Sequence, residues 1–147
     1  MKVSMKALAL SAALLLPLTA ARADEPNPYT DGPITVVTYV KILPGGFDAY
    51  MKFLATTRKA EMDEQMKAGL ILNTHVYQAQ ARGPHEADMI LTVTYKNWAA
   101  FDGLSDKQDA ISKKLMGSLD KATAASVDRG KIREILGSET IQELILK

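Results

Sequence analysis

The order of six segments with regular hydrophobic spacing is the feature that most constrains this chain. Residues 34–43, 70–82, 88–96 and 139–147 are rich in β-branched and aromatic residues or alternate apolar with polar ones, which is typical of strands. The other two segments, 47–68 and 105–125, repeat apolar residues at helical intervals. The sequence therefore predicts the order strand, helix, strand, strand, helix, strand.

Glycine and proline mark where these predicted segments end. Pro44 and Gly45 follow the first strand directly, and Gly69 follows the first helix at the position that commonly ends a helix. Gly83 and Pro84 separate the second and third strands, which we expect to form an antiparallel hairpin. After the third strand we expect a short helical turn that carries Trp98 and Phe101. The spacing within 126–138 is ambiguous, so the sequence leaves the path of these residues open.

This order of elements is the split βαβ, or ferredoxin-like, pattern. In that fold a four-stranded antiparallel sheet carries both helices on one face. The expected fold class is α+β, with 34–147 as a single domain and 24–33, which contains three prolines, as a flexible leader. Both sets of side chains of the first strand are largely apolar, whereas an open antiparallel sheet normally alternates apolar with polar residues. We therefore expect a second copy of the chain to cover the other face of the sheet.

Two stretches make the chain resemble the dimeric α/β-barrel superfamily, in which two ferredoxin-like protomers pack their sheets face to face. They are VTYVKILPGGFDAYMKF, a strand that leads through Pro-Gly into a helix, and LTVTYKNWAAFDGL, a strand followed by an aromatic helical turn. Both are similar to small secreted or cytosolic proteins related to the antibiotic-biosynthesis monooxygenase group. The resemblance implies a homodimer around a central cavity. The superfamily includes cofactor-free oxygenases, haem-degrading enzymes and proteins without known activity, so it leaves the function open.

The first 23 residues have the form of a cleaved export signal. Lys2 and Lys6 precede an uncharged run that is rich in leucine and alanine, and the small residues Ala21 and Ala23 bracket a position suited to signal peptidase. The apolar run of about a dozen residues is shorter than the roughly 20 that a membrane-spanning helix needs. We therefore expect cleavage after Ala23 and a periplasmic or secreted product without a membrane anchor.

Composition excludes several classes of site. The chain has no cysteine, so thiol chemistry and disulfides are excluded. Residues 24–147 keep 15 basic and 17 acidic residues, a net charge of about −2 that favours neither nucleic acid nor an anionic membrane as a partner. His85, Glu86 and Asp88 match no compact metal-ligand spacing. The sequence thus predicts no metal and no cofactor.

The second strand contains the strongest candidate for chemistry. Alternation places Asn73, His75 and Tyr77 on one face, where His75 can act as a general base and Tyr77 and Tyr39 can act as hydrogen-bond partners. The competing interpretation is a structural histidine that is satisfied by a neighbouring tyrosine or backbone group. The same pocket can continue over two threonines, which are also simply good strand formers. The candidate residues are His75, Tyr39 and Tyr77 for catalysis, and Asn73, Thr92 and Thr94 for ligand binding.

Two functions remain open at this point. The first is a protein that binds a small apolar molecule in a barrel cavity without chemistry. The second is a cofactor-free enzyme with monooxygenase- or isomerase-like activity, in which His75 serves as acid or base. The absence of a multi-residue catalytic motif favours the first, and the polar face of the second strand favours the other.

Overall fold

The computed structural model describes residues 26–147. The predicted export signal at 1–23 and its cleavage site lie outside the described residues. Within the part that is described, no helix has the length and apolar character that crossing a membrane requires. The elements, in chain order, are β1 (Tyr29–Ile42), α1 (Phe47–Phe53), the π-helical turn η1 (Leu54–Arg58), α2 (Lys59–Lys67), β2 (Asn73–Gln78), β3 (Met89–Tyr95), the 3₁₀ turn η2 (Trp98–Phe101), α3 (Leu104–Met116), α4 (Leu119–Arg129) and β4 (Arg133–Leu146).

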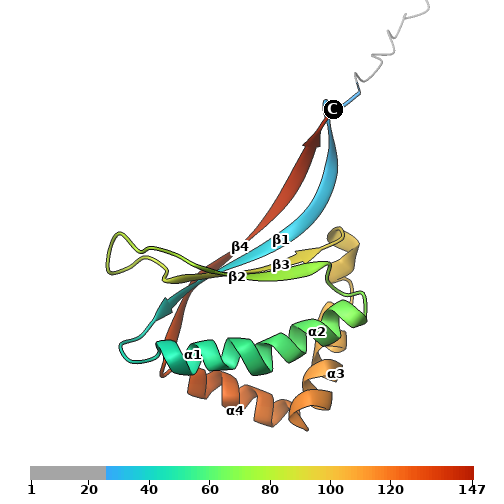
Figure 1. Cartoon of the computed structure of the whole chain (residues 1–147). Coiled ribbons are helices and arrows are strands. Elements are labelled where there is room, and N and C mark those ends of the chain that lie inside the picture. The colour runs from blue at the N-terminus through green and yellow to red at the C-terminus, as the bar shows by residue number, and fades with distance from the viewer. Residues whose placement is uncertain (1–25) are drawn as a thin grey trace, which may run out of the picture.

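The four strands form one antiparallel sheet, and the helices lie together on one of its faces (Figure 1). The strand order is β2-β3-β1-β4. This arrangement confirms the predicted α+β, ferredoxin-like fold, including the antiparallel hairpin of β2 and β3. Among the described residues no helix lies on the opposite face of the sheet, which is called the open face below.

The core lies between the sheet and the helix layer. It consists of two clusters, in which alternate residues of β1 and β3 meet apolar side chains of the helices and the loops beside them. Tyr50 of α1 is 2 % exposed, and its ring stacks on Phe53 with 5.8 Å between ring centroids. The buried members of the first cluster are Val40, Tyr50, Leu54, Met89 and Leu91, and those of the second are Met62, Ile71, Tyr95 and Leu104.

The helical segment predicted from 105 to 125 consists of two helices, so the prediction of one continuous helix was wrong. Gly117 ends α3 with a φ of +86°, a conformation that residues with a side chain rarely adopt. Ser118 then caps α4, because its Oγ accepts a hydrogen bond from the backbone N–H of Lys121 at 3.2 Å. The Gly-Ser pair therefore stops one helix and starts the next, and α4 continues to Arg129.

The first and last strands, β1 and β4, are longer than the sequence predicted. β1 begins at Tyr29, inside the range 24–33 that we expected to be a flexible leader, and β4 begins at Arg133. Residues 29–31 pair with residues 144–146, and a register shift after Asp31 accommodates Gly32 and Pro33. Because an irregular position at a strand edge tolerates proline, the composition of this segment did not prevent strand formation.

Residues 29–33 and 143–146 together form a projection that we call the arm. The pairing of β1 with β3 begins only at Ile34, so within the described chain the arm is a two-stranded ribbon. In Figure 1 it bends away from the helix layer, toward the side of the open face.

Candidate functional site

The open face of the sheet collects the candidate residues that the sequence singled out. Cross-strand pairing arranges them in three rows, because residues directly opposite each other point to the same face. The register places His75 opposite Thr92 and Tyr77 opposite Ile90. It also places Thr92 opposite Val37, and Ile90 opposite Tyr39. From β2 to β4 the rows are Asn73, Thr94, Thr35 and Ile141; His75, Thr92, Val37 and Glu139; and Tyr77, Ile90, Tyr39 and Gly137.

This face has a mixed character that suits an amphipathic ligand or a second sheet. Val37 at its centre is only 8 % exposed. The hydroxyl groups of Thr35 and Thr94 lie 3.0 Å apart and share a hydrogen bond across β1 and β3. At the two edges Tyr77 and Ile141 are each about half exposed. The apolar side chains are thus interrupted by hydroxyl groups that are already paired.

His75 lies near the edge of the open face. Its side chain is exposed, and its ring centroid lies 5.8 Å from that of Tyr77, with the rings tilted by 43°. Tyr39 is in the same row as Tyr77 but two strands away, which corresponds to about 10 Å at the usual strand spacing. The three predicted catalytic side chains thus share one surface, and His75 and Tyr77 are in contact while Tyr39 stands apart.

Tyr39 is paired with a carboxylate on the neighbouring strand. Its hydroxyl donates a hydrogen bond of 2.5 Å to Oε1 of Glu139. This hydrogen bond is the main cause that raises the pKa of Tyr39 above its ordinary value, with smaller contributions from burial and from the charge of Glu139. The phenol therefore keeps its proton at neutral pH and serves as a hydrogen-bonding group rather than as a base.

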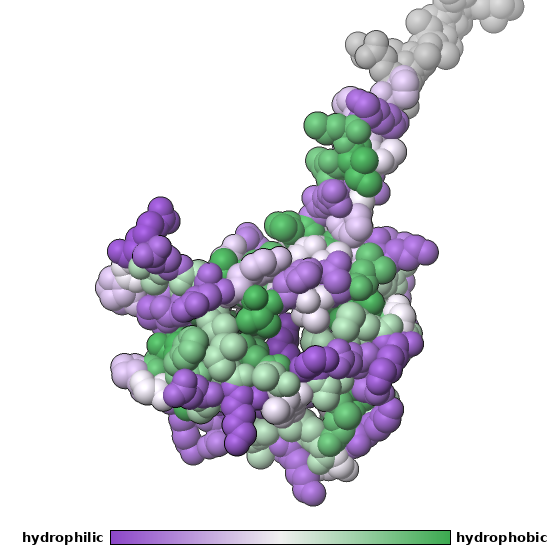
Figure 2. Space-filling model, in the orientation of Figure 1, coloured by the Kyte–Doolittle hydropathy of each residue, from purple (hydrophilic) through white to green (hydrophobic). Residues whose placement is uncertain are grey.

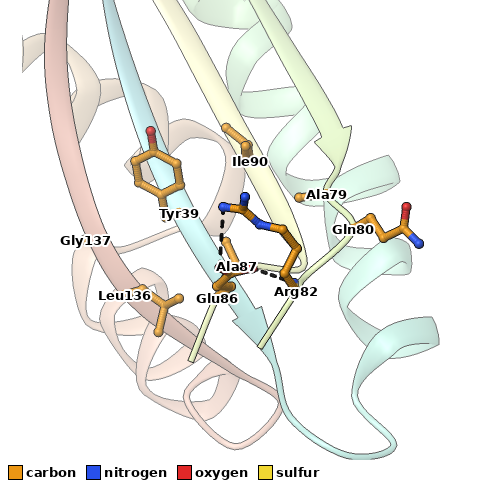
Figure 3. A pocket seen from close by; sticks show the side chains of 9 residues that line it. All are labelled: Tyr39, Ala79, Gln80, Arg82, Glu86, Ala87, Ile90, Leu136 and Gly137. Atoms are coloured by element: carbon orange, nitrogen blue, oxygen red, sulfur yellow. Dashed lines mark hydrogen bonds and ion pairs between the residues drawn. The ribbon is translucent and has the colours of Figure 1, made fainter. Parts of the chain in front are cut away.

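A hollow of about 410 Å³ lies where the open face meets the loop between β2 and β3 (Figure 3). Ile90 and Tyr39 come from the central strands, and Leu136 comes from the point where the register of β4 shifts against β1. The lining residues are Tyr39, Ala79, Gln80, Arg82, Glu86, Ala87, Ile90, Leu136 and Gly137. Among the candidates from the sequence, Tyr39 lines this hollow, while Asn73, His75, Tyr77, Thr92 and Thr94 do not.

Polar contacts hold the loop that borders the hollow. The backbone N–H of Arg82 donates to Glu86 Oε2 at 2.5 Å, and the Arg82 guanidinium lies 3.6 Å from the other carboxylate oxygen. At the base of the loop, Asp88 accepts hydrogen bonds from the backbone N–H of Ile42 at 2.8 Å and from Lys41 Nζ at 3.1 Å. The bond from Ile42 is the main cause that lowers the pKa of Asp88, with a smaller contribution from Lys41.

Sequence reasoning missed most of the hollow. Leu136 and Gly137 lie in the stretch 126–138, whose path the sequence leaves open. The predicted strand 70–82 runs into the loop 79–87, because β2 ends at Gln78. The run Ala79-Gln80-Ala81 was the available signal, because small side chains leave room beside a sheet. A register shift in β4 cannot be read from apolar spacing, since it depends on the pairing with β1.

The described residues contain no group of three or more His, Asp or Glu side chains that could hold a metal ion. Glu86 lines the hollow, and Asp88 is engaged with Lys41 and Ile42. The chemical groups that the open face offers are therefore a histidine, two tyrosines, threonine hydroxyl groups, the amide of Asn73, the carboxylate of Glu139 and one Arg–Glu pair.

Comparison with known proteins identifies a fold and not a family. No protein-family model matches the chain, and no curated protein matches it. Among solved structures, the chain is similar to HapK from Hahella chejuensis, with 13 % identity, a TM-score of 0.49, and coverage of 75 % of this chain and 91 % of that one. It is also similar to a dimeric ferredoxin-like protein from an uncultured marine organism, with 15 % identity, a TM-score of 0.50, and coverage of 80 % and 98 %. The second similarity supports the conclusion that this chain has the ferredoxin-like fold.

Proposed function

We propose that the chain is exported and forms a homodimer that binds a small apolar molecule between two open faces. The observation that carries this proposal is the open face itself, which has an apolar centre, paired hydroxyl groups and a hollow at one end. Tyr77 and Ile141 at its edges are each about half exposed, and such apolar surface is costly to leave in water. A second copy of the same sheet offers a matching surface. One structural relative is a dimeric ferredoxin-like protein, which is in keeping with this arrangement.

The bound molecule should be small and largely apolar, with a polar group. The hollow offers the side chains of Ile90 and Leu136, beside the tyrosine hydroxyl of Tyr39 and the guanidinium of Arg82. Pockets that bind small molecules commonly combine an apolar lining with a few polar groups that fix the orientation of the ligand. Oxidation or isomerisation is not required for this function, and no cofactor takes part in it.

The test measures binding and assembly in the same variants. We expect the wild-type chain without its first 23 residues to sediment as a dimer and to bind anilinonaphthalene sulfonate with increased fluorescence. Replacing Ile90 with Glu places a charge on the open face and should weaken both properties at least tenfold. The matched control is Val127→Glu, because Val127 is 71 % exposed on the helix layer.

Two outcomes would contradict the proposal. The first is a wild-type protein that stays monomeric at high micromolar concentration. The second is probe binding that Ile90→Glu and Val127→Glu change equally, which would place the apolar surface outside the open face.

The second candidate is a cofactor-free enzyme of the monooxygenase or isomerase kind, in which His75 transfers a proton. The contact between the rings of His75 and Tyr77 favours it, because a neighbouring phenol can orient an imidazole or a substrate. Oxygen uptake with small phenolic substrates tests this function. Turnover that His75→Ala abolishes, while the dimer persists, would support the enzyme. Absence of turnover in the wild-type dimer would leave the binding function.

A further inference from the structure

The arm lacks the support that the rest of the sheet receives. Within residues 26–147, the strand pairing of the arm is that of its own two segments across β1 and β4, whereas β1 gains a second neighbour, β3, from Ile34 onward. Leu144, Ile145 and Leu146 are 51 %, 48 % and 79 % exposed, and Figure 2 shows hydrophobic residues along this projection. A two-stranded ribbon is only marginally stable in water unless its apolar side chains pack on something. The described residues of one chain leave these side chains exposed, so the arm would gain stability from packing on another surface.

The hollow and the arm lie at opposite ends of β1. The arm contains the first residues of this strand, and the hollow is lined by Tyr39 near its end. Eight residues separate Asp31 from Tyr39, which corresponds to about 26 Å along a strand. The arm of a chain thus cannot reach the hollow of the same chain, although it bends toward the side of the open face on which the hollow lies (Figure 1).

Symmetry relates these two features when two open faces meet. In one arrangement the two-fold axis lies between the sheets and is perpendicular to the strands. The strands of the two copies then run in opposite directions, so each arm lies over the end of the partner's sheet that carries the hollow. An axis that runs along the strands would instead place the two arms at the same end, side by side. Only the first arrangement covers an exposed apolar ribbon and an apolar hollow in one contact, and it does so twice.

We propose that the arm of each chain packs into the hollow of a second copy, so that each site is built by two chains. The apolar residues of the arm would meet Ile90 and Leu136, while Asp31 and Glu143 on the arm would approach Arg82, whose side chain is 89 % exposed. Opposite charges at the rim of an apolar contact favour one orientation of the partners. This inference rests on the proposed homodimer, and it makes the arm the wall that closes the ligand cavity.

The absence of cysteine from the chain allows a direct test by engineered disulfides. Leu146→Cys marks the tip of the arm, and Gln80→Cys marks the hollow. Within one chain Leu146 pairs with Tyr29, and Gln80 follows Gln78, which is level with Val40 in the sheet. The stretch of β1 from Tyr29 to Val40 therefore separates the two positions, which corresponds to about 35 Å. A disulfide requires Cα atoms within about 7 Å, so the pair can bond only between chains.

We expect the double variant to give a covalent dimer under mild oxidation, and each single variant to remain at the mass of one chain. Mixing the two single variants should also give the covalent dimer. The matched control combines Leu146→Cys with Lys113→Cys instead of Gln80→Cys. Lys113 is exposed on α3 in the helix layer, so this variant should give no cross-link above background.

Sedimentation of the same variants separates failure of this inference from failure of the dimer. Rapid cross-linking of Leu146→Cys alone would show two arms side by side, which overturns the inference and leaves the dimer intact. A sedimenting dimer without any cross-link in the double variant would also overturn it. A monomer in every sample would overturn the homodimer itself, together with this inference.

Discussion

Pairs of side chains on neighbouring strands set the chemical character of the open face. Tyr39 donates to Glu139 from β1 to β4, and Thr35 and Thr94 share a hydrogen bond between β1 and β3. Each of these side chains is therefore already engaged before any ligand arrives. His75 differs from them, because it is exposed and its ring contacts that of Tyr77. At the residue scale, His75 is the group best placed to respond to a ligand or a partner.

Because Tyr39 is hydrogen-bonded to Glu139, we expect its phenol to ionise at a higher pH than an ordinary tyrosine. The hydrogen bond stabilises the protonated phenol, so its contribution to stability is fully present below pH 10 and is lost as the pH rises through the raised pKa. The absorbance of tyrosinate measures this ionisation, and the component that disappears in Tyr39→Phe belongs to Tyr39. We expect this component to move to lower pH in Glu139→Gln. An unchanged midpoint would show that the pair does not persist in solution.

For Asp88 we expect the opposite pH dependence, in which stability is lost at low pH instead of at high pH. Hydrogen bonds from Ile42 and Lys41 stabilise its charged form, so the stability that they give is present above the ordinary carboxyl pKa and is lost as the pH falls below it. Urea unfolding should show that Asp88→Ala is less stable than wild type at pH 7, with a smaller difference at pH 3. The control, Asp102→Ala, removes an exposed carboxylate and should change the free energy of unfolding by less than about 0.5 kcal/mol.

At the scale of elements, close contact of the backbone fixes the turn between β1 and α1. A Cβ atom on Gly46 would lie 2.3 Å from the carbonyl oxygen of Ile132, which also accepts a hydrogen bond from the N–H of Leu43 at 3.0 Å. This contact joins the start of α1 to the segment between α4 and β4. Glycine is therefore required here by the close approach of two chain segments, although its φ of −85° would suit any residue.

We expect Gly46→Ala to lower the free energy of unfolding by about 1–3 kcal/mol, because the added methyl group forces two packed segments apart. Thermal or urea denaturation measures this change. Gly83→Ala is the matched control, since a Cβ atom at Gly83 meets nothing within 4 Å, and its effect should be close to zero. Equal effects of the two substitutions would contradict the role of this contact.

At the scale of the whole molecule, the long first and last strands distinguish this chain from a minimal ferredoxin-like domain. β1 and β4 each contain 14 residues, while β2 and β3 contain 6 and 7. The excess length forms the arm, and it extends the sheet beyond the area that the helices cover (Figure 1). Such an extension buries apolar side chains only when another surface meets it, which is the physical reason to expect assembly.

The export signal expected from the sequence leads to a prediction about the form in which the protein accumulates. Expressed with its full sequence in a bacterium with a Sec pathway, the chain should be recovered outside the cytoplasm with Asp24 as its first residue. Intact-mass spectrometry of the fractionated cells measures this terminus. A replacement of Ala23 by a bulky residue such as Phe should block processing and leave the longer chain. Recovery of the chain with its first residues intact outside the membrane fraction would contradict the predicted cleavage.

The amino-acid sequence by itself determined the order of strands and helices, because apolar spacing and the Gly and Pro residues at segment ends are local properties. It also grouped Asn73, His75 and Tyr77 on one face, since alternation along a strand needs no partner. The antiparallel register then added Tyr39, Thr92 and Thr94 to that face. Only the tertiary structure decided the length of β1 and β4 and the place of the hollow. Both depend on how β4 pairs with β1 and where that register shifts, and pairing between residues about 100 positions apart leaves no periodic trace in the sequence.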